Sequence, residues 1–112
     1  MRKLAVFSLI GLVLEAPPAL AKDIQFWNLT QDKIVALQLS PAGNDIWGKN
    51  QTDNDPDHAV DPDERLKITD TISGTYDVRF RDEKGRTCVV KNLIISAGQI
   101  FSIEESMLKD CK

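Results

Sequence analysis

The sequence has few of the side chains that most enzymes and metal sites use. Among its 112 residues there are one histidine, His58, and two cysteines, fewer than a zinc site of cysteine and histidine ligands needs. His58 follows Asp57, but no serine or cysteine nucleophile is placed to complete an acid–base arrangement. A glycine-rich phosphate loop, a Gly-x-Ser-x-Gly motif and paired carboxylates on strands are also missing. The sequence therefore predicts a protein that is not an enzyme, with His58 exposed in a loop.

Hydrophobic runs long enough to span a membrane are missing as well. The longest run, from Leu4 to Leu14, has eleven residues, whereas a transmembrane helix needs about 20. Two basic residues precede this run, two prolines follow it, and Ala19-Leu20-Ala21 fits a cleavage site. Residues 1–21 are therefore predicted to be a signal peptide. Residues 22–112 are predicted to form a single domain that is periplasmic or secreted and has no stable membrane anchor.

The predicted mature domain is acidic. The signal peptide carries two of the 14 lysines and arginines and one of the 17 acidic residues, which leaves residues 22–112 with a net charge of −4. This balance argues against nucleic acid or an anionic membrane as the main partner. If the domain has a partner, we expect another periplasmic protein.

Both cysteines, Cys88 and Cys111, lie in the exported part. An even number of cysteines in an oxidising compartment predicts a disulfide, which would tie the C-terminal tail to the fifth strand. Closing a loop of about 24 residues stabilises a fold by about 3.5 kcal/mol in the chain-entropy model. Two free thiols are the alternative, and a redox pair is disfavoured because the spacing is not Cys-x-x-Cys.

Hydrophobic patterning predicts a domain made of strands. Short runs rich in aromatic and β-branched residues alternate with polar turns, and no long amphipathic helix interrupts them. We expect an all-β fold, a small antiparallel β-sandwich or open barrel of about six strands, with a hairpin between the first two and one helical turn in the tail. The predicted strands cover residues 23–29, 33–40, 65–70, 75–81, 86–95 and 99–104.

The fourth predicted strand has the clearest alternation. Tyr76, Val78 and Phe80 are expected to point inward, and the charged residues between them outward. The outward set favours a solvated face of mixed charge, and a patch for an anionic partner is the alternative. This set consists of Asp77, Arg79, Arg81 and, on the next strand, Arg86.

Residues 41–64 form a long loop, and long loops in small domains are often functional or mobile. Its large aromatic residue, Trp47, is expected to fold back as a core plug, with display as a binding anchor as the alternative. If a partner docks here, Asp53, Asp55 and Asp57 are expected to form the contact surface.

Acidic residues in this loop also partly match a calcium-binding pattern. Asp53, Asp55, Asp57, Asp61 and Glu64 fall at positions 1, 3, 5, 9 and 12 of an EF-hand loop. However, histidine replaces the glycine that the turn needs, and no helix flanks the loop. These residues are therefore only a weak calcium candidate, no cofactor is predicted, and a solvated loop that shields a sheet edge is favoured.

The segment from Leu39 to Asn50 (LSPAGNDIWGKN) resembles a family of small secreted bacterial proteins of unknown function with a Ser-Pro…Trp-Gly motif. An Asn-x-Thr turn at Asn28, a Pro-x-Glu segment at Pro62 and the run from Tyr76 to Arg79 extend the resemblance over most of the mature chain. Asp63 stands where that family usually has glycine, and the link after Trp-Gly is longer and more acidic here. The resemblance implies a periplasmic β-domain and assigns no activity.

Together these observations predict a non-enzymatic exported domain that binds another molecule. One alternative is an inhibitor or immunity-type protein that inserts residues 41–64 into a partner enzyme. A weak calcium-dependent module is the other.

Overall fold

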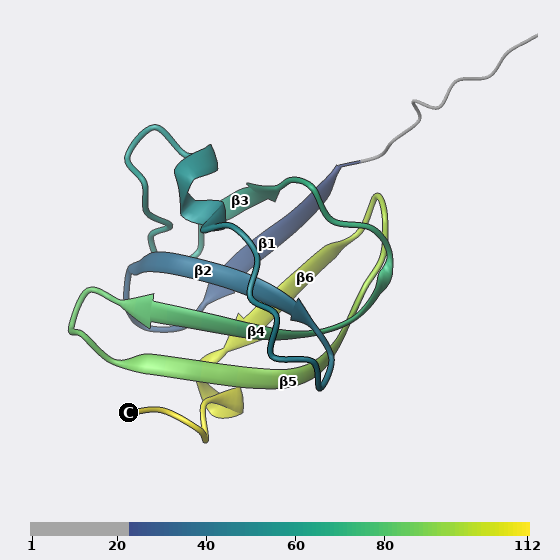
Figure 1. The fold of residues 1–112 in the computed structure, drawn as a ribbon. Coiled ribbons are helices and arrows are strands. Elements are labelled where there is room, and N and C mark those ends of the chain that lie inside the picture. Colours follow the sequence, from purple (N-terminus) through teal and green to yellow (C-terminus); the bar gives the residue numbers. More distant parts are fainter. Residues whose placement is uncertain (1–22) are drawn as a thin grey trace, which may run out of the picture.

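The computed structural model describes residues 23–112, and the predicted signal peptide lies outside this range. Six strands form two three-stranded sheets, ordered β3-β1-β6 and β2-β4-β5, packed against each other (Figure 1). The predicted small all-β sandwich is therefore confirmed. Helical structure in the described range is limited to two short 3₁₀ turns, η2 (Gln51–Asn54) and η3 (Glu105–Met107), and neither could cross a bilayer. The strands are β1 (Ile24–Leu29), β2 (Ile34–Pro41), β3 (Arg65–Ile68), β4 (Gly74–Asp82), β5 (Thr87–Ile95) and β6 (Ile100–Glu104).

The predicted hairpin between the first two strands is wrong. β1 pairs with β3 and β6, whereas β2 pairs with β4 in the opposite sheet. The short link at residues 30–33 crosses between the sheets, so the apolar sides of β1 and β2 face each other across the core instead of lying side by side. The pairing of β1 with β6 is parallel, and the other three pairings of these strands are antiparallel.

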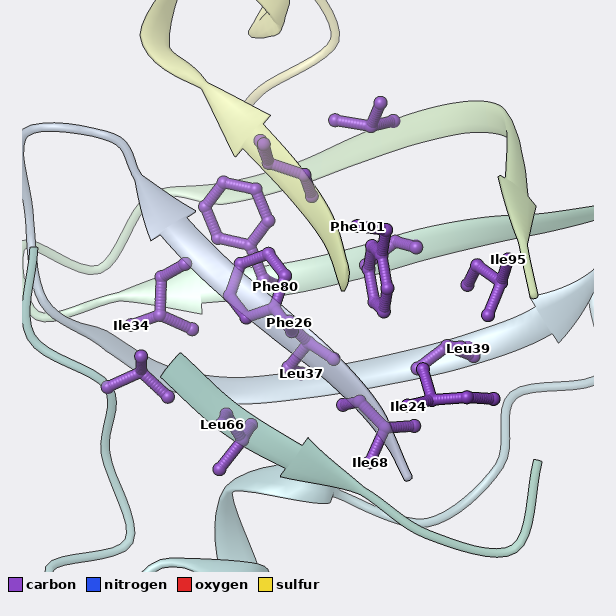
Figure 2. Packing of buried hydrophobic residues seen from close by; sticks show 14 of the residues in the cluster. Ile24, Phe26, Ile34, Leu37, Leu39, Leu66, Ile68, Phe80, Ile95 and Phe101 are labelled. Atoms are coloured by element: carbon purple, nitrogen blue, oxygen red, sulfur yellow. The ribbon is translucent and has the colours of Figure 1, made fainter. Parts of the chain in front are cut away.

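The core lies between the two sheets and receives side chains from every strand (Figure 2). Phe26 of β1 and Phe101 of β6 pack with their ring centroids 5.3 Å apart. Fully burying a side chain of this kind stabilises a fold by about 1.5–3 kcal/mol. The other buried apolar members are Ile24, Ile34, Leu37, Leu39, Val60, Leu66, Ile68, Val78, Phe80, Cys88, Val90, Ile95 and Ile103.

A bulge in β5 lies opposite Asp77 of β4. Val78 and Phe80 are buried as predicted, and Arg79 and Arg81 point outward. Asp77 lies on the same outer face, as predicted, but only 6% of it is exposed, so it is covered and not solvated. The register between β4 and β5 shifts at this position, and Asn92 on β5 takes the left-handed conformation with φ of 61°. The extra residue of the bulge brings a backbone N–H to the Asp77 carboxylate, which allows it to be buried.

The disulfide between Cys88 and Cys111 is confirmed and connects β5 to the tail. Backbone hydrogen bonds join the same two segments, because Thr87 and Lys112 exchange both N–H···O contacts, at 2.9 and 2.8 Å. The predicted helical turn in the tail is also present, as η3. The tail therefore covers the part of the β5 edge that ends near Val89, whose N–H donates to the Asp110 carbonyl oxygen.

The loop after β2 runs back along the free edge of that strand. The Gly48 N–H donates to the Leu39 carbonyl oxygen at 2.9 Å, and the Asn50 Oδ1 atom accepts from the Leu37 N–H at 2.9 Å. These contacts satisfy edge groups that could otherwise pair with another chain.

Two amide side chains of the same loop cover the edge of β3. The Gln51 amide donates to the Thr69 carbonyl oxygen at 2.9 Å and accepts from the Thr69 N–H at 3.0 Å. The Asn54 Nδ2 atom donates to the Lys67 carbonyl oxygen at 2.8 Å. The predicted shielding of a sheet edge by this loop is therefore confirmed, and it extends to edges of both sheets.

Candidate functional site

Trp47 lies on the outer surface of the β2-β4-β5 sheet and not in the core, so its predicted role as a core plug is wrong. The ring is partly exposed, and its neighbour Ile46 is 66% exposed. The Trp47 Nε1 atom donates to Asp45 Oδ1 at 3.0 Å. The Arg79 guanidinium carbon lies 4.4 Å from the ring centroid, within the range of a cation–π contact. A tryptophan fixed in this way keeps apolar surface available without the entropy of a mobile side chain.

Asp77 holds the loop that carries Trp47. Its Oδ2 atom accepts from the Gly43 N–H at 3.0 Å, and its Oδ1 atom accepts from the Asn92 N–H at 3.0 Å. The hydrogen bond from Gly43 is the main cause that lowers the pKa of Asp77. Burial acts to raise this pKa, but the Asn92 N–H and the charge of Lys91 lower it further, so the pKa stays below its ordinary value. The charged carboxylate thus joins the loop to the bulge of β5.

A hollow of about 350 Å³ opens beside Trp47, over β4 and β5. Charged groups of both signs line it. Asp45, Asp77 and Asp110 contribute carboxylates, and Lys91 contributes an ammonium group. The acidic groups outnumber the lysine, so this side of Trp47 is negative.

A second hollow, of about 230 Å³, lies over the same sheet and has the opposite charge. Arg79 and Arg81 of β4 provide its charged groups, and its other outward-facing residues are neutral: Ala36 and Gln38 from β2, and Thr87 from β5. The Arg79 Nη2 atom donates to Gln38 Oε1 at 2.8 Å, which fixes the guanidinium against the sheet. Arg79 lies between the two hollows, under the Trp47 ring.

We refer to Gln38, Trp47, Arg79, Arg81 and Lys91 as the Trp47 face. Aromatic and arginine side chains held on a rigid sheet are typical of protein-binding surfaces. Both hollows are shallow, and the smaller one is below the range of about 300–1,000 Å³ that small-molecule pockets occupy. The arrangement therefore favours contact with side chains of another macromolecule.

The acidic segment predicted as a contact surface lies apart from Trp47. Its 3₁₀ turn η2 packs on β2 and β3, whereas Trp47 lies over β4. Asp53 is 3.5 Å from His58 Nδ1, and Asp55 Oδ2 accepts from the Asp57 N–H at 2.8 Å. His58 is exposed, as predicted. These carboxylates therefore shape their own loop, and whether they also contact a partner stays a prediction.

The remaining calcium candidates are also used within the loop. Glu64 Oε1 accepts from the Asp61 N–H at 2.8 Å, and the Asp61 carboxylate lies 3.8 Å from Lys33 Nζ. In residues 23–112 no group of three or more histidine, cysteine, aspartate or glutamate side chains is arranged to hold a metal ion. The structure does not bring the five predicted ligands together into such a group.

The other tryptophan makes a similar contact on the opposite side of the sandwich. Trp27 of β1 lies under the Arg65 guanidinium, at 4.7 Å from the ring centroid, and its Nε1 atom donates to Asp63 Oδ1 at 3.2 Å. Trp27 lines neither of the two hollows described above. Trp27 therefore provides a matched reference for Trp47, because it has the same kinds of contact on the opposite sheet.

We expect the Asp77→Asn substitution to loosen the loop that carries Trp47. The amide nitrogen would meet an N–H donor at one of its two contacts, so a buried hydrogen bond would be lost at a cost of about 1–3 kcal/mol. Hydrogen exchange should then accelerate at the amides of Gly43 and Asn92. Asp45→Asn is the control, because an exposed amide oxygen can still accept from Trp47. Unchanged protection at Gly43 in Asp77→Asn would contradict the role of Asp77 as a clamp.

The chain matches no protein-family model, no curated protein and no solved structure, so its resemblance to the family with the Ser-Pro…Trp-Gly motif stays a prediction.

Proposed function

We propose that this domain is a non-enzymatic binding protein of an exported compartment and that it contacts another protein through the Trp47 face. The position of Trp47 carries this proposal. A loop places the ring over a sheet instead of burying it, and Asp45, Arg79 and the Asp77 clamp keep it in place. Tryptophan and arginine together are the residues most enriched among those that dominate binding energy.

The covered strand edges of the sandwich favour an outer sheet face as the binding surface. Loop segments cover β2 and β3, and the tail covers part of β5. Beyond the tail, β5 carries Lys91 and the bulge at Asn92, which are two features that prevent strand addition. A partner is therefore more easily accommodated on an outer face than by extending a sheet at β2, β3 or β5.

Export is part of the same proposal. The buried disulfide is compatible with an oxidising compartment, either the periplasm or the medium. The predicted signal peptide would deliver the chain there.

An inhibitor or immunity-type role is the narrower version of this function. It would require residues 41–64 to enter a cleft of the partner, with Asp53, Asp55 and Asp57 in contact. The internal hydrogen bonds of this segment give it a fixed shape. A loop with a fixed shape loses little conformational entropy when it enters a cleft. Replacing these three aspartates with asparagine separates the two versions, because only the inhibitor version loses binding.

The test compares Trp47→Ala with Trp27→Ala. We expect Trp47→Ala to remove capture of a discrete partner from periplasmic extract and to weaken its affinity at least tenfold by calorimetry once the partner is identified. Trp27→Ala should retain binding. Because neither ring is in the core, each variant should lose no more than about 2 kcal/mol of stability. Equal binding by Trp47→Ala and the wild type would contradict the proposed surface.

A further inference from the structure

Arg79 and Arg81 have no acidic neighbour across the sheet. They stand two residues apart on β4, so their side chains leave the same face of the strand. Arg79 is opposite Gln38 on β2 and Val89 on β5, and Arg81 is opposite Ala36 and Thr87. Directly opposed residues are the positions where a strand normally places a compensating charge. Here all four of these positions are neutral.

Five of the nine other basic side chains in residues 23–112 are compensated by a carboxylate, and Arg65, Lys91, Lys109 and Lys112 are not. Arg86 contacts three carboxylates, and four lysines lie within 4.0 Å of one, whereas neither Arg79 nor Arg81 forms an ion pair with residues 23–112. Two uncompensated guanidinium groups on one face repel each other, in a domain that is otherwise acidic. The paired lysines are Lys33, Lys49, Lys67 and Lys84.

The space between these arginines suits one carboxylate. Ala36 is small enough to leave a hollow of about 230 Å³, and Thr87 lines the hollow as well. A guanidinium can bind a carboxylate through two parallel N–H···O bonds. Arg79 is already held by Gln38 and by the Trp47 ring, so little conformational entropy would be lost when it binds.

We propose that the hollow between Arg79 and Arg81 receives an aspartate or glutamate side chain of the partner protein while Trp47 packs on the apolar surface beside it. This inference rests on the proposed function and specifies the chemistry of the partner. A protein is favoured over a polyanion because the basic hollow is small and local. A long anionic polymer or an anionic membrane would also meet Asp45 and Asp110 and the net charge of −4 of the domain.

The experiment uses a phage-displayed library of random dodecamer peptides, selected on the oxidised domain purified from the periplasm. We expect the enriched peptides to carry an acidic residue close to an apolar one. A synthetic copy of the best peptide is then titrated by fluorescence anisotropy. Arg79→Gln/Arg81→Gln should weaken its affinity at least tenfold. Replacing the acidic residue of the peptide with its amide should weaken affinity to a similar extent, and the two changes together should cost little more than either one.

Arg65→Gln/Lys67→Gln is the matched control, because these basic residues also stand two apart on an outer face, that of the opposite sheet. It should bind the peptide as the wild type does, and thermal melting followed by circular dichroism shows that every variant is folded. Arg81→Gln alone leaves the contacts of Trp47 intact. It should also weaken the affinity for the peptide, which keeps the test valid if the double variant is unstable.

The possible failures are distinguishable. Peptides whose binding needs Trp47 but neither arginine would overturn the carboxylate site and leave the proposed function standing. No enrichment over the bare support, or binding that is unchanged in Trp47→Ala, would overturn both. Arginine-dependent binding to phosphatidylglycerol vesicles or to alginate, at an affinity equal to that for the peptide, would overturn the choice of a protein carboxylate as the occupant.

Discussion

Asn28→Ala is expected to lower the free energy of unfolding by about 3 kcal/mol, from several lost hydrogen bonds worth about 0.5–1.5 kcal/mol each. The Asn28 side chain is completely buried where the chain crosses between the sheets. Its Nδ2 atom donates to the carbonyl oxygens of Asp32 and Val60, at 3.0 Å each. Its Oδ1 atom accepts from the backbone N–H of Thr30 at 3.0 Å and from the Thr30 hydroxyl at 2.7 Å. Alanine would leave these partners without water or a replacement.

Asn50→Ala is the control for this prediction. Asn50 begins the second Asn-x-Thr sequence and accepts from the N–H and hydroxyl of Thr52 in the same way, but it is partly exposed. Asn50 also accepts from the Leu37 N–H. Because Asn50 is partly exposed, water can replace part of its contacts, so the loss should be smaller, about 1 kcal/mol. Urea denaturation measures both variants. If Asn28→Ala were as stable as Asn50→Ala, the burial of Asn28 would not explain the importance of its hydrogen bonds at the link between the sheets.

Strand positions could be predicted because their periodicity is local. In the run from Tyr76 to Arg81, alternation predicts that Val78 and Phe80 point into the core. This prediction does not depend on which strands pair with β4. The same holds for Leu66 and Ile68 of β3. The disulfide could be predicted for a different reason, because two cysteines leave only one possible pair.

The pairing of strands could not be predicted in the same way. A short polar link after Leu29 is compatible with a hairpin and equally with a crossing between sheets. The choice depends on Asn28, whose side chain bonds the link to Val60, a residue more than thirty positions away. The parallel pairing of β1 with β6 is equally non-local.

The candidate site depends on the same kind of distant contact. The sequence predicts a buried Trp47, because a loop tryptophan with an apolar neighbour usually packs into the core. Its actual position is set by Arg79 on β4 and by Asp77, which the alternation placed outside. A sequence feature for this bulge exists, since Lys91-Asn92 interrupts the apolar run of β5. The feature identifies neither the aspartate that it faces nor the loop that this aspartate holds.

Asp82→Asn is expected to lower stability by about 2–3 kcal/mol at neutral pH, the usual cost of losing a buried hydrogen bond to a charged group. The Asp82 side chain is 1% exposed at the end of β4. It accepts from the N–H groups of Lys84 and Arg86 at 3.0 Å each and from Arg86 Nε at 2.9 Å. Asparagine would place an amide donor against the guanidinium, and Arg86 would lose its closest carboxylate.

The effect of this substitution should depend on pH. Burial acts to raise the pKa of Asp82, but the hydrogen bonds and charge of Arg86, with the Lys84 N–H, outweigh it and leave the pKa below its ordinary value. A lowered folded-state pKa means that the charged carboxylate stabilises the fold fully above the unfolded-state pKa of about 3.9. This contribution is lost as the pH falls through the folded-state pKa. The stability difference between wild type and Asp82→Asn should therefore be constant from about pH 5 to 8 and shrink below about pH 4.

Glu105→Gln is the control for the Asp82 experiment, because Glu105 contacts the same guanidinium at 3.4 Å from a half-exposed position. Its loss should be below about 1 kcal/mol, as for other solvent-screened ion pairs. Urea denaturation at a series of pH values measures all three proteins. A deficit of Asp82→Asn that persisted unchanged to pH 2 would mean that packing, and not the charge of Asp82, connects the β4–β5 turn to Arg86.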